Sequence, residues 1–204
     1  MRISVRSIGS FGLMIGSFAL ASCVRSTVSN EKTNFTHIDS LTETYLTLQD
    51  SLLHSWHLLV KDEDQKLKAI ENTINQLIKL SPSNIAQLEV LKTRLNQLKE
   101  IHITQKTLSN QDVVEEYDFA SNSLISEVLS IAEANPALLV DNQLSSSIEK
   151  IKVTDQRALN FRLAYDSIAN EFNAFLEKNK GMLKEIDNST SLEKRPMFNT
   201  ASNK

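Results

Sequence analysis

Apolar residues recur every three or four positions along most of the chain after residue 40, which is the spacing of one face of an α-helix. The first stripe comprises Leu41, Tyr45, Leu48, Leu52, Trp56 and Leu59. Ser40 and Glu43 have capping-box spacing, so we expect this helix to begin at Ser40 and to end near Lys61. The acidic run 62–64 lacks the glycine and ligand spacing of a calcium loop. We interpret it as a solvated hairpin or as the first turn of the next helix.

A second stripe comprises Leu67, Ile70, Ile74, Leu77, Leu88, Leu91, Leu95 and Leu98. Ser81-Pro82-Ser83-Asn84 interrupts it, and proline normally breaks a helix because it has no backbone N–H group. The spacing nevertheless continues in phase across the interruption, which a loop has no reason to preserve. We therefore predict one long second element with a kink or a short re-capped joint at Pro82, in which residues 65–80 and 85–105 are roughly collinear.

Two further helices are indicated in the second half of the chain. One runs from about Asn110 to Ala134, and its stripe comprises Val113, Tyr117, Ala120, Leu124, Val128 and Ile131. The other starts near Asp141 or Asn142, stops around 179–181, and carries Leu144, Ile148, Ile151, Ala158, Tyr165, Ile168, Phe172 and Phe175. Such amphipathic helices have only one another to pack against, which predicts an all-α, antiparallel long-helix bundle of about four helices.

Composition supports this fold class and narrows the possible partners. The chain holds only four glycines and three prolines, and aromatic residues make up 6% of it, which favours a few long helices over strands. Its formal net charge is −3, and loss of Arg2 and Arg6 with a leader would make the remainder more acidic. We therefore expect no nucleic-acid partner and no electrostatic attraction to an anionic lipid surface.

The N-terminal region has the features of a bacterial export signal. Two arginines precede an uncharged stretch from Ile8 to Ala21, and small residues lead to Cys23, the only cysteine in the chain. Leu20-Ala21-Ser22-Cys23 resembles a lipobox, so we predict that Cys23 becomes the lipid-modified N-terminus of a membrane-anchored envelope lipoprotein. An uncleaved anchor and plain secretion are the alternatives, and all three place the mature domain outside the cytoplasm.

The expected organisation of the chain follows from these boundaries. Residues 1–22 form the signal peptide, and 23–39 form a polar tether between the lipid and the bundle. The helical bundle occupies 40–183. Residues 184–204 are expected to be a polar, disordered tail with one local feature, Arg195-Pro196-Met197-Phe198.

Several short motifs resemble those of the LemA family. Asn135-Pro136-Ala137-Leu138 and Thr154-Asp155-Gln156-Arg157 are similar to its Y-P-x-L and T-E-N-R elements. Tyr45 and Trp56 resemble a Y-N…A-W segment of its first helix, and residues 195–198 resemble its closing R-P-x-F. Positions that match its A-R-x-x-Y-N…E-Y-N stretch are Arg162, Tyr165, Asp166, Glu171, Phe172 and Asn173.

The resemblance is most specific over about residues 134–173, and the chain also departs from the family pattern. Leu67–Asn72 lack the two arginines and the proline that begin the family's second helix, and the F-P after its fourth helix is missing. The resemblance implies an antiparallel α-helical bundle held at a bacterial membrane by an N-terminal helix or, in some members, by a lipobox. It implies no established catalytic activity.

Little in the sequence points to a reactive centre. His54 and His57 share a helix face, but no cysteine is available to complete a zinc site with them. The chain also has no glycine-rich phosphate loop and no nucleophile elbow. We therefore predict no metal site, no catalytic residue and no cofactor, and we expect Trp56 to be a core or interface residue.

The remaining candidates are polar motif positions, namely Thr154, Arg157, Arg162, Tyr165 and Asn173. The two arginines could bind a partner or pair with neighbouring acids, and we prefer the second interpretation. The leading hypothesis is a structural or adaptor protein that binds an unidentified envelope protein partner. The alternative is a ligand carrier or enzyme with a cleft near Arg157, Arg162 and Tyr165, which buried titratable groups converging on a pocket would favour.

Overall fold

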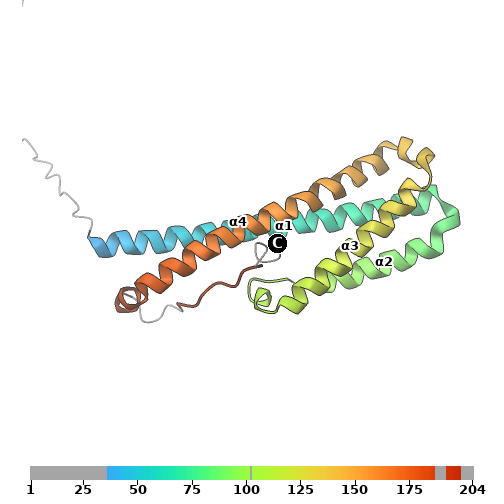
Figure 1. Cartoon of the computed structure of the whole chain (residues 1–204). Helices are drawn as coiled ribbons and strands as arrows, with labels where there is room; N and C mark the ends of the chain where they lie inside the picture. The colour runs from blue at the N-terminus through green and yellow to red at the C-terminus, as the bar shows by residue number, and fades with distance from the viewer. Residues whose placement is uncertain (1–35, 102, 187–191, 199–204) are drawn as a thin grey trace, which may run out of the picture. The chain divides into compact units, whose positions relative to one another are not determined.

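The computed structural model describes residues 36–101, 103–186 and 192–198. They contain four α-helices, three short 3-10 helices and no strand, which confirms the predicted all-α bundle (Figure 1). No helix in these ranges is long and apolar enough to span a membrane. The predicted signal peptide, Cys23 and most of the tether lie outside the described residues.

Helix α1 spans His37–Leu80 without interruption, so the predicted end near Lys61 is wrong. Nothing in the acidic run 62–64 breaks a helix, and Asp62 is buried there rather than exposed in a hairpin. The helix begins one turn before the predicted capping box. Thr36 accepts a hydrogen bond from the backbone N–H of Asp39, and the Asp39 carboxylate accepts one from Thr36 in return.

The chain reverses at Pro82, so the prediction of collinear segments on either side is also wrong. Ser81 leaves the helical conformation, as expected of a residue that precedes proline, and a 3-10 turn at Pro82–Asn84 leads into α2, Ile85–Glu100. Figure 1 shows α2 returning antiparallel to α1. Leu77 and Leu88 face the same core. Two helices of a hairpin must both present apolar stripes to that core, so preserved phase does not distinguish a hairpin from a kink.

The second helical hairpin agrees more closely with the sequence. Helix α3 spans Gln111–Glu133, and the Asn110 side chain caps it by accepting from the backbone N–H of Asp112. Helix α4 spans Asn142–Ile186, and Asp141 accepts from the backbone N–H of Leu144. The 3-10 helices Thr107–Ser109 and Pro136–Val140 precede these two helices. Helix α4 continues past its predicted end, because Gly181 lies within the helix rather than after it.

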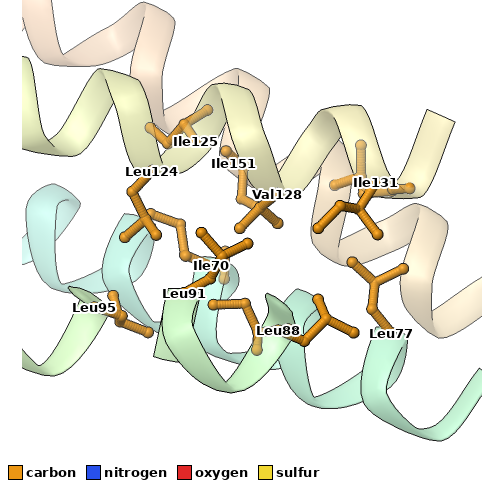
Figure 2. Packing of buried hydrophobic residues seen from close by; sticks show 14 of the residues in the cluster. Ile70, Leu77, Leu88, Leu91, Leu95, Leu124, Ile125, Val128, Ile131 and Ile151 are labelled. Carbon is orange, nitrogen blue, oxygen red and sulfur yellow. The ribbon is translucent and has the colours of Figure 1, made fainter. Parts of the chain in front are cut away.

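The helices enclose two separate hydrophobic cores. The first lies where all four helices are present, and Figure 2 shows its side chains converging from α1, α2, α3 and α4. The second lies along the N-terminal part of α1 and the C-terminal part of α4, and the start of the α3 region also contributes to it. Its buried members are Leu41, Tyr45, Leu48, Leu52, Leu108, Val114, Tyr165, Ala169, Phe172, Leu176, Leu183 and Phe198. The α1–α4 pair therefore gains part of its cover from the C-terminal segment, which supplies Phe198.

Candidate functional site

A layer of polar and charged side chains lies between the two cores. We call it the polar belt, and it consists of Asp62, Glu63 and Lys66 from α1, Tyr117 and Asp118 from α3, and Arg157 and Arg162 from α4. Asp62 and Lys66 are 6% and 4% exposed, which is unusual for charged residues. Buried charges need partners, so the contacts of each belt residue decide what the belt can do.

Asp62 forms an ion pair with Arg157, in which the arginine Nη2 donates to the carboxylate Oδ1. Burial raises the pKa of the Asp62 carboxyl, and the nearby Arg157 charge opposes that shift. The second carboxylate oxygen, Oδ2, is buried without a hydrogen-bond partner among the described residues. Arg157 itself is exposed, so it serves as a surface partner for a buried carboxylate.

Glu63, Lys66 and Tyr117 form the centre of the belt. The Lys66 Nζ lies 2.9 Å from the Glu63 Oε1, and the Tyr117 hydroxyl donates a hydrogen bond to the same oxygen. Burial and the negative charge of Glu63 raise the pKa of Tyr117, so this phenol stays protonated. The group links α1 to α3 through one shared carboxylate oxygen.

Arg162 pairs with Asp118 in a two-pronged arrangement. Its Nη1 and Nη2 donate to the two carboxylate oxygens at 2.6 Å each. Burial disfavours the Arg162 charge, but the hydrogen bonds to Asp118 prevail and raise the pKa of Arg162. This pair joins α3 to α4, so Arg162 pairs with an acid of another helix rather than with a neighbour on its own helix.

Thr154 is 1% exposed and lies on α4 beside the belt. Its hydroxyl donates to the carbonyl oxygens of Lys150 and Ile151 in the preceding turn, at 2.7 and 3.0 Å. A threonine can satisfy its buried hydroxyl in this way without any partner from another helix. Thr154 therefore has a local structural role here.

The segment 192–198, predicted to be disordered, lies against α4 instead (Figure 1). Asn173 holds its backbone with both ends of the side-chain amide. The Nδ2 donates to the Arg195 carbonyl at 2.9 Å, and the Oδ1 accepts from the Arg195 N–H at 2.7 Å. The Tyr165 hydroxyl donates to the Pro196 carbonyl at 3.3 Å, and the Phe198 N–H donates to the Asp166 Oδ1 at 2.7 Å. The remaining tail residues, 187–191 and 199–204, lie outside the described residues.

Phe198 completes an aromatic cluster. Its ring stacks on Trp56 at 6.3 Å between centroids and meets the edge of Tyr165 at 5.9 Å. Trp56 and Tyr165 also contact each other at 5.5 Å, and the Arg162 guanidinium lies 4.9 Å from the Phe198 ring centre. Burial raises the pKa of Tyr165 to about 12. Trp56 is half-buried and acts as an interface aromatic, as predicted.

A groove of about 300 Å³ opens beside the belt. Apolar side chains from α1, α2, the segment after α2 and the docked tail form its walls, namely Leu59, Val60, Leu67, Leu98, Ile101, Ile103 and Phe198. Glu63, Tyr117 and Arg162 are its polar residues nearest the belt centre. The cleft expected near Arg157, Arg162 and Tyr165 therefore exists only in part, because neither Arg157 nor Tyr165 lines this groove.

The motif residues that the sequence singled out fall into two groups. Arg157, Arg162 and Thr154 lie in or beside the belt, whereas Tyr165 and Asn173 hold the C-terminal segment. Sequence reasoning missed the acidic partners Asp62 and Asp118, since neither stands in a motif. It also missed the docking of the tail, although its isolated R-P-x-F-like segment was a signal that could have indicated it. His54 and His57 are exposed, and no metal-binding cluster occurs in the described ranges.

No protein-family model, curated protein or solved structure matches the chain. The resemblance to the LemA family therefore stays a prediction that its short motifs carry.

Proposed function

We propose that this chain is a lipid-anchored protein of the bacterial envelope whose helical bundle serves as an adaptor for an envelope protein partner. The leader and the single cysteine, Cys23, support the anchor, because lipid attachment to an exported protein requires a thiol after small residues. The all-α bundle supports the adaptor role, since long helices offer extended faces for binding another protein.

One observation carries the adaptor proposal: the polar motif residues are engaged in contacts within the chain itself. Arg162 uses two guanidinium nitrogens on Asp118, Arg157 pairs with Asp62, and Asn173 uses its whole amide on the tail backbone. Groups committed in this way hold helices and tail together. A nucleophile or general base would instead need to reach a substrate in a pocket.

The anchor is tested by the intact mass of the protein extracted from membranes. We expect a chain that begins at Cys23 and carries acyl chains. A Cys23→Ser variant is the matched control, and it should lose both the added mass and the membrane association. A mass equal to the whole 204-residue chain, or a soluble product cut elsewhere, would contradict the anchor.

The adaptor role is tested by photo-crosslinking in living cells. Leu46 and Leu53 are 51% and 56% exposed on α1 and lie outside both cores, so a crosslinking amino acid at either position leaves the fold intact. We expect an adduct of one discrete mass with an envelope protein, and its loss when Cys23→Ser removes the anchor. An unchanged adduct in the unanchored variant, or none from any exposed face, would contradict an adaptor at the membrane.

A ligand carrier is the second candidate, and the groove beside Arg162 and Tyr117 favours it. Its lining combines apolar side chains with charged ones, which suits a small amphiphilic ligand; the charged residues are Glu63, Asp64, Lys68, Glu71, Lys99 and Arg162. Native mass spectrometry of protein purified from envelopes would show such a ligand as added mass. Leu67→Trp should abolish that mass by filling the groove, whereas Lys79→Trp on an exposed face of the same helix should retain it.

A further inference from the structure

The C-terminal segment is bound in the way that a peptide is bound by a separate protein. Residues 192–198 form no helix or strand of their own, and their described contacts are made largely with side chains of α1 and α4. We propose that this face of the α1–α4 pair is a peptide-binding site. It is filled here by the chain's own Arg195–Phe198, and it accepts the same segment from a second copy of this chain.

Backbone recognition is the first observation that supports the site. Four hydrogen bonds reach the main chain within four residues, two from Asn173, one from Tyr165 and one from Asp166. A side-chain amide that binds both the N–H and the carbonyl of one residue makes the same pair of hydrogen bonds to an extended backbone that a neighbouring β-strand would make. Such a contact fixes the register of the segment and leaves its side chains free to determine specificity.

Side-chain recognition is the second observation. Phe198 is 3% exposed and fits between Trp56, Tyr165 and the Arg162 guanidinium. At the other end of the segment, the Arg195 guanidinium lies 5.5 Å from the Phe172 ring centre. Pro196 between them restricts the free segment to extended conformations, which lowers the entropy lost on binding. The site therefore selects a basic residue, a proline and a phenylalanine at fixed spacing.

A second copy is the occupant that these contacts favour. Both halves of the interface are present in every chain, so a tail from another molecule satisfies the same hydrogen bonds and ring contacts that the chain's own tail satisfies. A short intramolecular connection gives the chain's own tail an effective concentration on the order of millimolar. We therefore expect to detect exchange of tails between copies only when the contact between a tail and its own chain is weakened. This inference goes beyond the adaptor role, because it requires neither the lipid nor an envelope partner.

Two complementary variants of the mature chain test the exchange. In the acceptor, Phe198→Ala weakens the tail and leaves the site intact. In the donor, Asn173→Ala with Asp166→Ala removes three of the four backbone contacts and leaves the tail intact. We expect each variant alone to sediment as a monomer at micromolar concentration. Mixed in equal amounts, they should form a dimer of one acceptor and one donor.

A synthetic peptide with the sequence of residues 192–198 provides the second measurement. It should bind the acceptor with one-to-one stoichiometry and restore the emission of Trp56, the only tryptophan in the chain. A control peptide with alanine for Phe198 should bind about thirtyfold more weakly or worse, as expected for loss of a buried aromatic anchor. Far-ultraviolet circular dichroism of both variants verifies that the helices remain folded.

The outcomes separate the parts of the proposal. Peptide binding together with the mixed dimer supports it. If the peptide binds but no mixed dimer forms up to about millimolar concentration, the second copy is not the occupant. About millimolar is the effective concentration that a short internal connection gives the chain's own tail. A folded acceptor that fails to bind the peptide overturns the peptide-binding site itself. None of these results depends on whether Cys23 carries lipid, so failure here is distinguishable from failure of the proposed function.

Discussion

Docking of the C-terminal segment should be measurable as a separate contribution to stability, and Phe198→Ala is the change that tests it. The Phe198 side chain is almost fully buried, which stabilises the docked state by roughly 1.5–3 kcal/mol through removal of apolar surface from water. Its two ring contacts, with Trp56 and Tyr165, contribute about 0.5–1.5 kcal/mol each beyond that area. Truncation to alanine would thus cost about 3–5 kcal/mol if the segment stayed in place, as at other buried phenylalanines.

The segment need not stay in place, and this lowers the expected loss. Because residues 192–198 are held at the surface of the α1–α4 pair, they can detach while the helices remain folded. The loss in unfolding free energy therefore cannot exceed the net free energy of docking. We expect Phe198→Ala to lower the unfolding free energy by about 2–3 kcal/mol, slightly less than the intact contact would suggest.

Urea unfolding followed by Trp56 fluorescence and by circular dichroism measures both effects. Loss of the stacked Phe198 ring should shift the native emission of Trp56 to longer wavelength while helicity stays unchanged. Asn173→Ala alone should cost about 1–2 kcal/mol, because it removes two hydrogen bonds, but less than about 0.5 kcal/mol when Phe198 is already alanine. Additive losses in the double variant, or unchanged Trp56 emission, would refute docking as one cooperative unit.

Three further predictions concern the belt and the first core. Burial raises the pKa of Asp62 above its ordinary 3.8. The folded state therefore favours the protonated carboxyl, and the stability that this form contributes is complete below pH 3.8 and is lost as pH rises through the folded-state pKa. Asp62→Asn should be neutral or stabilising at pH 7, with the difference from the wild type vanishing near pH 4. Arg162→Lys should cost about 1–3 kcal/mol, since lysine cannot form both bonds to Asp118. Leu91→Ala should cost about 2–5 kcal/mol.

Denaturant titrations followed by circular dichroism measure the change in unfolding free energy for all three variants. A fall of more than about 1 kcal/mol for Asp62→Asn at pH 7 would mean that the Arg157 ion pair outweighs the cost of burying the charge. Wild-type stability in Arg162→Lys would mean that the Asp118 pair behaves as a solvated surface contact. Val90→Ala is the control for Leu91→Ala, because Val90 is 59% exposed and should change stability by no more than about 0.5 kcal/mol. An equal loss at both positions would contradict the core assignment.

The helix boundaries show where sequence patterns carry information and where they do not. Asn110 and Asn135-Pro136 bracket α3 as predicted, because capping and the missing proline N–H are local effects. The prediction of collinear segments at Pro82 is wrong, because in-phase apolar stripes occur both in one continuous helix and in two antiparallel helices. Which of the two forms depends on the core that the stripes share, and that is a tertiary property. The charged run 62–64 predicts a hairpin or a helix start, yet it lies within α1. Its buried acid, Asp62, pairs with Arg157, which is 95 residues away in the sequence.

The candidate site was predictable to a similar extent. Periodicity located five of the eight predicted core positions of α4, but Ala158, Ile168 and Phe175 are only partly buried, and the buried Ala169 and Leu176 lie one position further on. The motif resemblance selected Arg162, Tyr165 and Asn173, all of which make contacts between segments. Their roles were not predictable, since a polar residue on a helix does not reveal its partner. Asp118 and the docked Phe198 became visible only when the fold brought distant parts of the chain together.

The polar belt should also determine how the molecule yields to force. Helices α1 and α4 each run through both cores, so no loop separates the two ends of the bundle. A load applied at the N-terminus of α1 would first peel His37 and the following turns from α4, with only the second core and the tail resisting. Peeling would then reach Asp62, where the ion pairs to neighbouring helices and the four-helix core beyond them must break together. We expect the molecule to extend in two steps, with unfolding pausing at the polar belt between them.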